Sequence, residues 1–195
     1  MGKTLWKPGT MIYPLPAVLI SCGSNPEEYN IITIAWTGTI CTDPPMCFIS
    51  VRPQRYSYGI IKKNGDFVIN LTTKKLAKAT DWCGVRSGSK FNKFKEMGLN
   101  PEKASFVKAP LIKESPINIE CKIIEIKELG VHHMFIAEVL GIHADNKYMN
   151  ESTGAFHLED ASPICYSHGK YYELGSFIGK FGFSVKKKKK FKKKK

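Results

Sequence analysis

The stretch SVRPQRYSYG, residues 50–59, contains the residue types that bind anions. Arg52 and Arg55 supply guanidinium groups, and Ser57 stands directly before a segment, 58–64, that we predict to be a short helix with Ser57 as its N-cap. A helix start presents unpaired backbone N–H groups, so guanidinium groups beside it would complete a phosphate site. A second interpretation stays open, in which the stretch is only a polar turn.

A second segment, VRSGSKFNKF at residues 85–94, repeats this combination. Arg86 and Ser87 are followed by Gly88, which permits a tight turn, and by a helix that we predict from about Lys90 onward. Lys90 and Lys93 would add positive charge to that helix. Basic helix starts are common, so each segment alone is a weak signal, but two in one chain point to a phosphate-bearing ligand.

A third feature is the β-branched run YNIITIAWTGTI, residues 29–40, which we predict to be one strand. With alternating side chains, Thr33, Ala35, Thr37 and Thr39 share one face. Small and hydroxyl-bearing side chains would let a flat ring lie close to the backbone of this strand. The alternative is an ordinary strand of high β-propensity with no ligand.

Other chemistry is excluded by missing patterns. The sequence has no G-x-G-x-x-G, G-x-x-x-x-G-K-[ST], H-E-x-x-H or G-x-S-x-G motif. The five histidines lack metal-ligand spacing, so we expect no metal site and read them as turn or surface residues. No two of the six cysteines form a C-x-x-C pair, and we expect most of them to be reduced and buried as small hydrophobic residues.

The elements that must position these residues are mostly strands. We predict strands at 16–21, 29–40, 45–51, 66–71, 117–124 and 134–143, and helices at 58–64, 73–84 and 89–98. The apolar positions of 117–126 change parity near Ile123 or Ile124, which indicates a β-bulge there. Many strands without regular βα alternation indicate a mainly β fold, an antiparallel barrel with short helices.

Charge and length divide the chain into a domain and a tail. The 195 residues suffice for one domain, which we place at 1–185, and residues 186–195 form a lysine-rich tail that we expect to be disordered. Subtracting the nine lysines after Val185 from the net charge of +13 leaves +4 for the rest of the chain, which has no nucleic-acid recognition motif, so we do not expect a nucleic-acid partner. The alternative that stays open is that the tail contacts nucleic acid or anionic lipid. With neither a signal pattern nor a run of about 20 apolar residues, we expect a cytoplasmic protein without a membrane partner.

Four segments, in this order and spacing, resemble the flavin reductase-like, FMN-binding split-barrel family and its flavoredoxin-like branch. They are YPLPAVLISCG, the run from NIITIAWTGTI through DFVINL, DWCGVRSGSKFNKFKEMGL, and YYELGSFIGKFGFSVKK. The resemblance covers about residues 10–187. It implies a Greek-key split barrel that forms a homodimer, with FMN as cofactor near the subunit interface.

The resemblance also implies which residues hold the cofactor. Asn30, Thr33, Ala35, Trp36 and Thr37 would line the isoalloxazine ring and ribityl chain, Ser50, Val51 and Arg52 would follow the ribityl chain and phosphate, and Ser57, Ser87 and Lys93 would close around the phosphate. In this branch the first Ser-Gly of the third segment is more often followed by Arg-Asp-Val-Asp-Lys-Phe. Lys93 and Phe94 match that pattern, whereas Ser89, Lys90 and Asn92 do not, which favours Ser87 and Lys93 as the phosphate ligands.

The function implied is that of an NAD(P)H-dependent flavin or ferric reductase. The alternative is a flavoredoxin-type electron carrier, which exchanges electrons with protein partners without turnover of free flavin. Because the flavin carries the redox chemistry, neither activity demands an acid or base residue, and we name no catalytic residue. The sequence has no separate nicotinamide signature with which to choose between them.

Overall fold

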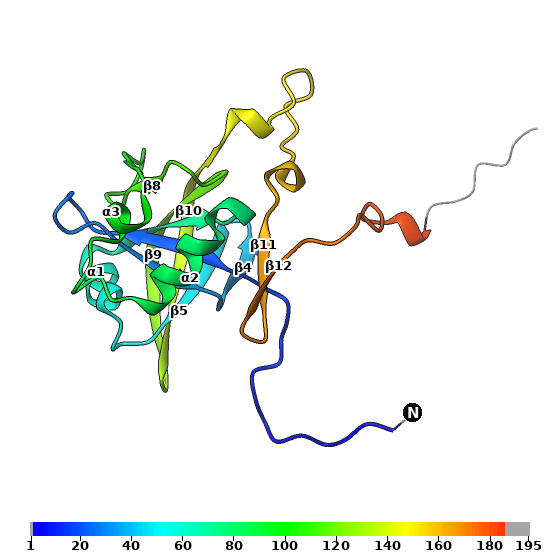
Figure 1. Cartoon of the computed structure of the whole chain (residues 1–195), viewed down its shortest axis with the longest axis horizontal. Coiled ribbons are helices and arrows are strands. Elements are labelled where there is room, and N and C mark those ends of the chain that lie inside the picture. The colour runs from blue at the N-terminus through cyan, green and yellow to red at the C-terminus, as the bar shows by residue number, and fades with distance from the viewer. Residues whose placement is uncertain (1, 186–195) are drawn as a thin grey trace, which may run out of the picture.

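The computed structural model describes residues 2–185, and the lysine-rich tail lies outside the described residues. Its main feature is a seven-stranded antiparallel sheet in the order β3-β2-β6-β9-β10-β5-β4, which confirms the mainly β prediction (Figure 1). The strands are β2 (Val18–Cys22), β3 (Asn30–Ile34), β4 (Thr37–Thr42), β5 (Pro45–Val51), β6 (Asp66–Leu71), β9 (Ile117–Leu129) and β10 (His132–Ala144). The predicted bounds of 45–51 and 66–71 are confirmed residue for residue.

The run at 29–40 is two strands, so the prediction of a single strand was wrong. β3 ends at Ile34 and β4 begins at Thr37, and these two strands lie at opposite ends of the sheet order. The chain therefore turns at Ala35 and Trp36, and the Trp36 carbonyl accepts a hydrogen bond from Ser50 N at 2.9 Å. This short connection joins the two ends of the sheet, which curls around its core.

The core fills the inside of the curled sheet. Its fully buried side chains include Ile20, Ile49, Phe67, Cys121 and Phe135, one from each of five strands. Burial of this kind is the main stabilising contribution in a domain of this size. A second cluster lies where two helices cover the outer face of the sheet, and it contains Leu19, Ile31, Leu76, Cys83 and Phe94.

The predicted β-bulge is confirmed in the long hairpin of β9 and β10. Ile123 pairs with Ala137 and Glu125 pairs with Ile136, so Ile124 is the extra residue. The bulge changes which face the side chains of β9 occupy, as the slip in the apolar pattern indicated. A second register shift lies between Val139 and Gly141.

The helices begin at positions other than those predicted. α1 spans Tyr56–Asn64, so Ser57 lies inside it; the N-cap is Arg55, which makes no side-chain cap bond. A 3₁₀ turn (Lys74–Leu76) precedes α2, which spans Ala77–Val85 and runs one residue past the predicted end. α3 spans only Lys93–Met97, because Asn92 rather than an earlier residue is the N-cap and its side chain accepts from Lys95 N at 3.1 Å.

A buried carboxylate anchors a loop on the outer face of the sheet. Glu120, fully buried on β9, accepts hydrogen bonds from the backbone N–H groups of Ser105, Phe106 and Val107 at 2.6–2.9 Å and contacts His143 Nε2 at 2.5 Å. Burial raises the pKa of Glu120, but these hydrogen bonds outweigh it and hold that pKa below its usual value.

The remaining elements lie beside the barrel. β1 (Leu15–Pro16), β11 (Ile164–Ser167) and β12 (Lys170–Glu173) form a small sheet, and β7 (Pro101–Glu102) pairs with β8 (Leu111–Ile112). Short 3₁₀ turns lie at Asn146–Tyr148, Leu158–Ala161 and Phe183–Val185. Both terminal segments run away from the barrel (Figure 1). Within residues 2–185, no helix is long and apolar enough to cross a membrane.

Candidate functional site

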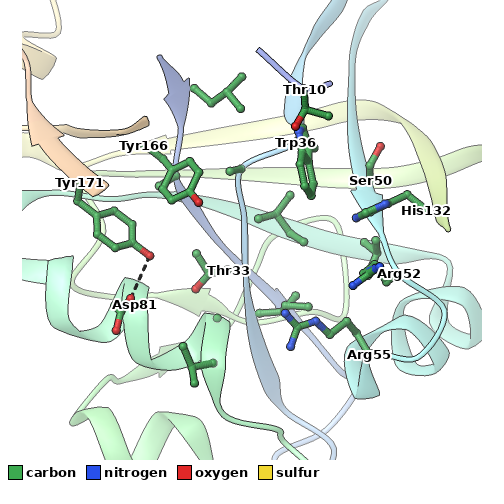
Figure 2. A pocket seen from close by; sticks show the side chains of 18 of the residues that line it. Thr10, Thr33, Trp36, Ser50, Arg52, Arg55, Asp81, His132, Tyr166 and Tyr171 are labelled. Carbon is green, nitrogen blue, oxygen red and sulfur yellow. Dashed lines mark hydrogen bonds between the residues drawn. The ribbon is translucent and has the colours of Figure 1, made fainter. Parts of the chain in front are cut away.

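A cavity of about 530 Å³ lies where the end of β3 and the end of β5 face the small sheet and α2. Figure 2 shows its two sides. On one side lie Trp36, Ser50, Arg52 and His132, and on the other lie Tyr166, Tyr171 and Asp81, with Thr33 between them. The first side comes from the barrel, and the tyrosines come from β11 and β12.

A second cavity, of about 130 Å³, adjoins the first and is lined by cationic and hydroxyl side chains. These are Arg55, Ser57, Arg86, Ser87 and Lys93. Arg55 and Ile32 border both cavities, so the two cavities are direct neighbours. The arginine-serine stretch and the Arg-Ser-Gly-Ser segment, distant in sequence, thus meet at the small cavity.

Most of the residues expected to hold the cofactor border these cavities. Thr33, Ala35, Trp36, Ser50, Val51 and Arg52 line the large cavity, and Ser57, Ser87 and Lys93 line the small one. Asn30 and Thr37 line neither, because both side chains are buried in internal hydrogen bonds. Asn30 Nδ2 donates to Ser57 Oγ at 2.7 Å, and Thr37 Oγ1 donates to the Phe48 carbonyl at 2.6 Å.

Asn30 does not line the small cavity but lies buried behind it, in contact with two of the segments that do. A Cβ atom placed on Gly88 would lie 2.2 Å from Asn30 Oδ1, closer than nonbonded atoms approach. The absence of a side chain at Gly88 therefore allows the Ser87–Lys90 turn to pack directly on Asn30. The same Asn30 amide holds the Ser57 hydroxyl, so one buried side chain fixes both walls of the cavity.

Lys93 is a buried cation at the start of α3. Its ammonium group donates to the Cys83 carbonyl at 2.7 Å, and the residue is only 3% exposed. Burial, together with the positive charge of Arg55, lowers the pKa of Lys93 to about 8. Within residues 2–185, no acidic side chain forms a salt bridge with it, so an anion in the small cavity would be its charge partner.

Several cavity residues were missed by sequence reasoning. His132 was read as a turn or surface histidine, yet it lines the cavity and meets Trp36 edge-on with ring centroids 4.8 Å apart. Its pKa is lowered by burial and by the charge of Arg52. Tyr171 donates to Asp81 Oδ1 at 3.4 Å, and burial together with that carboxylate raises the pKa of Tyr171 to about 12.

The two neighbouring cavities suit a molecule with a flat ring at one end and a phosphate at the other. The large cavity has aromatic and small side chains on its walls, and the small cavity has the donors and cations that a phosphate needs. A volume of about 130 Å³ corresponds to a few water molecules, which is the scale of one phosphate group. Among the described residues, no His, Cys, Asp and Glu cluster could hold a metal ion.

Comparison with known proteins agrees with this geometry. A family model described as "Flavin reductase like domain" matches residues 10–175. The structure is similar to flavoredoxin of Desulfovibrio vulgaris (Miyazaki F), with a TM-score of 0.86 and 30% identity over 95% of this chain and 100% of that chain. It is also similar to flavoredoxin from Methanosarcina acetivorans, with a TM-score of 0.84 and 25% identity over the same shares. A protein of Shewanella frigidimarina described as having a split barrel domain shares the fold, with a TM-score of 0.75 and 21% identity over 85% of each chain.

Proposed function

The chain belongs to the flavin reductase-like family, and from that premise we propose that this flavoprotein oxidoreductase binds FMN and takes electrons from NAD(P)H for free flavin or ferric iron. The observation that carries the proposal is the direct neighbourhood of an aromatic cavity and a cationic cavity, which share Arg55 and Ile32 as lining residues. A flavin mononucleotide has an isoalloxazine ring that suits the aromatic cavity and a terminal phosphate that suits the cationic cavity.

The proposed roles follow from position. The guanidinium group of Arg55, the hydroxyls of Ser57 and Ser87 and the ammonium of Lys93 would hold the phosphate, while Arg52, which lines only the large cavity, would lie beside the ribityl chain. FMN is favoured over FAD because the small cavity has room for one terminal phosphate and the chain has no dinucleotide fingerprint.

The bound flavin would supply the redox chemistry, accepting two electrons from a hydride donor. The chain would bind and orient it. Trp36 and the backbone of residues 33–36 border the large cavity on the barrel side, while Tyr166 and Tyr171 border it on the other side and limit the access of water. The positive side chains of Arg52 and Arg55 would favour the additional negative charge of a reduced, anionic ring system.

A second candidate is a flavoredoxin-type electron carrier that exchanges electrons with another protein. It is supported by the likeness to flavoredoxin of Desulfovibrio vulgaris over that protein's full length. Such a carrier would keep its cofactor and would reduce neither free flavin nor ferric iron at an appreciable rate.

One experiment separates these candidates. The chromophore of the purified protein is first extracted and identified by chromatography, where FMN is expected and FAD would contradict the assignment. NADH or NADPH is then added without oxygen while the flavin absorbance is followed. Rapid bleaching with turnover of added flavin supports the reductase, whereas bleaching only with a reduced partner protein supports the carrier.

We also propose that the protein is a homodimer. β4 and β12 are end strands of their sheets, and an end strand leaves backbone groups free to pair with another chain. Two-fold pairing is the commonest way for such surfaces to be covered. Sedimentation of the purified protein tests this proposal, and a monomer at all concentrations would contradict it.

A further inference from the structure

The large cavity carries charged side chains on both of its sides. Arg52 and Arg55 lie on the barrel side, and among the described residues that line the cavity Asp81 is the one acidic residue. Figure 2 shows Asp81, which belongs to α2, across the cavity from the two arginines. Phosphate binding at the cationic end gives Asp81 no role, so a carboxylate in this wall requires a separate explanation.

The Asp81 carboxylate is held in the wall by Tyr171. The Tyr171 hydroxyl, from β12, donates to Asp81 Oδ1 at 3.4 Å (Figure 2). Because burial and this carboxylate raise the pKa of Tyr171 to about 12, the tyrosine stays neutral, and the pair carries one negative charge at neutral pH. The hydrogen bond between α2 and the small sheet keeps that charge at the edge of the cavity.

The lysines of the same segment do not neutralise Asp81. Within residues 2–185, no cationic side chain forms a salt bridge with it. Lys78, one helical turn earlier, borders a separate cavity of about 350 Å³ near the start of α2. Lys74 is paired with Glu173 at 2.7 Å. The charge of Asp81 is therefore uncompensated on its side of the large cavity.

A bound phosphate would change the balance of charge around Asp81. The phosphate of FMN carries nearly two negative charges, which in the proposed complex would offset the charges of Arg55 and Lys93. Asp81 would then face Arg52 as the remaining cation that lines the large cavity. A charge in the wall of a cavity acts more strongly on an entering ion than a charge on an open surface, because the low-dielectric walls focus its field.

We propose that Asp81 selects the redox substrate by charge, so that anionic electron acceptors are repelled from the large cavity while uncharged and cationic acceptors enter it. Since the walls are aromatic, the preferred acceptor is a flat, uncharged molecule such as a quinone or a flavin without a phosphate, rather than an anionic ferric chelate. This choice of substrate rests on the proposed function. The repulsion of anions by Asp81 does not, and it can be measured without a flavin.

The first test compares the access of an anion and of a neutral molecule to the cavity. Iodide and uncharged acrylamide both quench tryptophan fluorescence. The signal of Trp36, which lines the cavity, is the difference between each protein and the same protein with Trp36→Phe. Asp81→Asn removes the charge but keeps an oxygen that can accept from Tyr171. We expect the ratio of iodide to acrylamide quenching to be at least about twofold higher in Asp81→Asn than in the wild type at low salt.

Salt and a second variant are the controls for this measurement. The difference between Asp81→Asn and the wild type should shrink as potassium chloride is raised to about 1 M, because salt screens the charge. Glu151→Gln removes an exposed acidic residue that lines neither cavity of the site, and it should give the wild-type ratio. An equal ratio in Asp81→Asn and the wild type, or a difference that salt does not reduce, overturns the proposal.

The second test measures the choice of acceptor in the flavin-loaded protein. Bound FMN is reduced with one equivalent of dithionite without oxygen, and its reoxidation by benzoquinone or by ferricyanide is followed by absorbance. The reduced flavin gives two electrons and two protons to one benzoquinone, or one electron to each of two ferricyanide ions while its protons pass to water. Ferricyanide carries three negative charges, and a twofold effect on a singly charged ion becomes about eightfold for three charges because the interaction energy is proportional to charge.

The ratio of the ferricyanide rate constant to the benzoquinone rate constant should therefore be at least about fivefold higher in Asp81→Asn than in the wild type. Glu151→Gln should leave this ratio unchanged. An unchanged or lower ratio in Asp81→Asn overturns the proposed choice of substrate. If the purified protein binds no FMN, the proposed function fails, while the iodide measurement still decides whether Asp81 repels anions from the cavity.

Discussion

Replacing Gly88 with alanine should damage both stability and the small cavity. The new Cβ would lie 2.2 Å from Asn30 Oδ1 and 2.7 Å from Asn30 Nδ2, so the turn or the buried Asn30 must move by about 1 Å. Overpacking of this kind costs about 1–3 kcal/mol, and losing the hydrogen bond from Asn30 to Ser57 costs about 1 kcal/mol more. We therefore expect the free energy of unfolding to fall by about 2–4 kcal/mol.

Urea unfolding of Gly88→Ala and the FMN dissociation constant would be measured together. Gly59→Ala is the matched control, since Gly59 lies within α1 with nothing within 4 Å of the added Cβ, and it should stabilise the helix by about 0.5–1 kcal/mol. For Gly88→Ala we expect FMN to bind at least about tenfold more weakly, because Ser57 and Ser87 both move. Unchanged stability would refute the packing argument, and lost stability with unchanged FMN affinity would refute the assignment of the phosphate cavity.

Three further predictions address charge. Arg55→Ala should weaken FMN binding at least about tenfold, because a hydrogen bond to a charged group contributes about 1.5–3 kcal/mol. Lys122→Ala, which removes an exposed charge, should leave FMN binding unchanged. Equal dissociation constants for the two variants in a fluorescence titration would contradict this prediction. FMN affinity should fall as the pH rises through about 8, because Lys93 loses its proton there while the phosphate stays dianionic. In the Lys93→Met variant this fall in affinity should be absent. A parallel fall in the wild type and in Lys93→Met would exclude Lys93 as its cause. Glu120→Gln should lower the free energy of unfolding by about 3 kcal/mol at pH 7. Since the pKa of Glu120 is lowered in the folded state, its contribution is present above the usual carboxyl value of 4.5 and is lost as the pH falls below it, so a pH-independent difference in urea midpoints would contradict the role of the carboxylate.

Much of the barrel could be predicted because local signals agreed with the final fold. The strands at 45–51 and 66–71 are short apolar runs between Pro, Gly and Asp residues, and their bounds were confirmed. The bulge at Ile124 was visible as a slip in alternation. The break at Ala35 and Trp36 was not visible, because strand-forming residues continue through it and the turn is imposed by closure of the sheet onto Ser50.

The part of the candidate site that could be predicted consists of residues that are close to each other in the sequence. Arg52, Arg55 and Ser57 lie within six positions of each other, so their combination could be recognised, although the helix start was misplaced. His132 and Tyr171 arrive at the cavity from later strands, and only the topology brings them there. Alternation along a strand predicts which face a residue occupies but not which distant element faces it.

The division of the large cavity between two sheets has an evolutionary consequence. Its barrel side comes mainly from residues 32–36 and 50–55, with His132, and the turn of this stretch at Ala35 and Trp36 joins the two ends of the seven-stranded sheet. A mutation there would alter the proposed cofactor site and the closure of the sheet together, so we expect few changes to be tolerated. Tyr166 and Tyr171 stand on the small outer sheet, which the barrel does not need for closure. Descendants of such a protein could therefore diverge in what approaches the cavity while keeping the same cofactor.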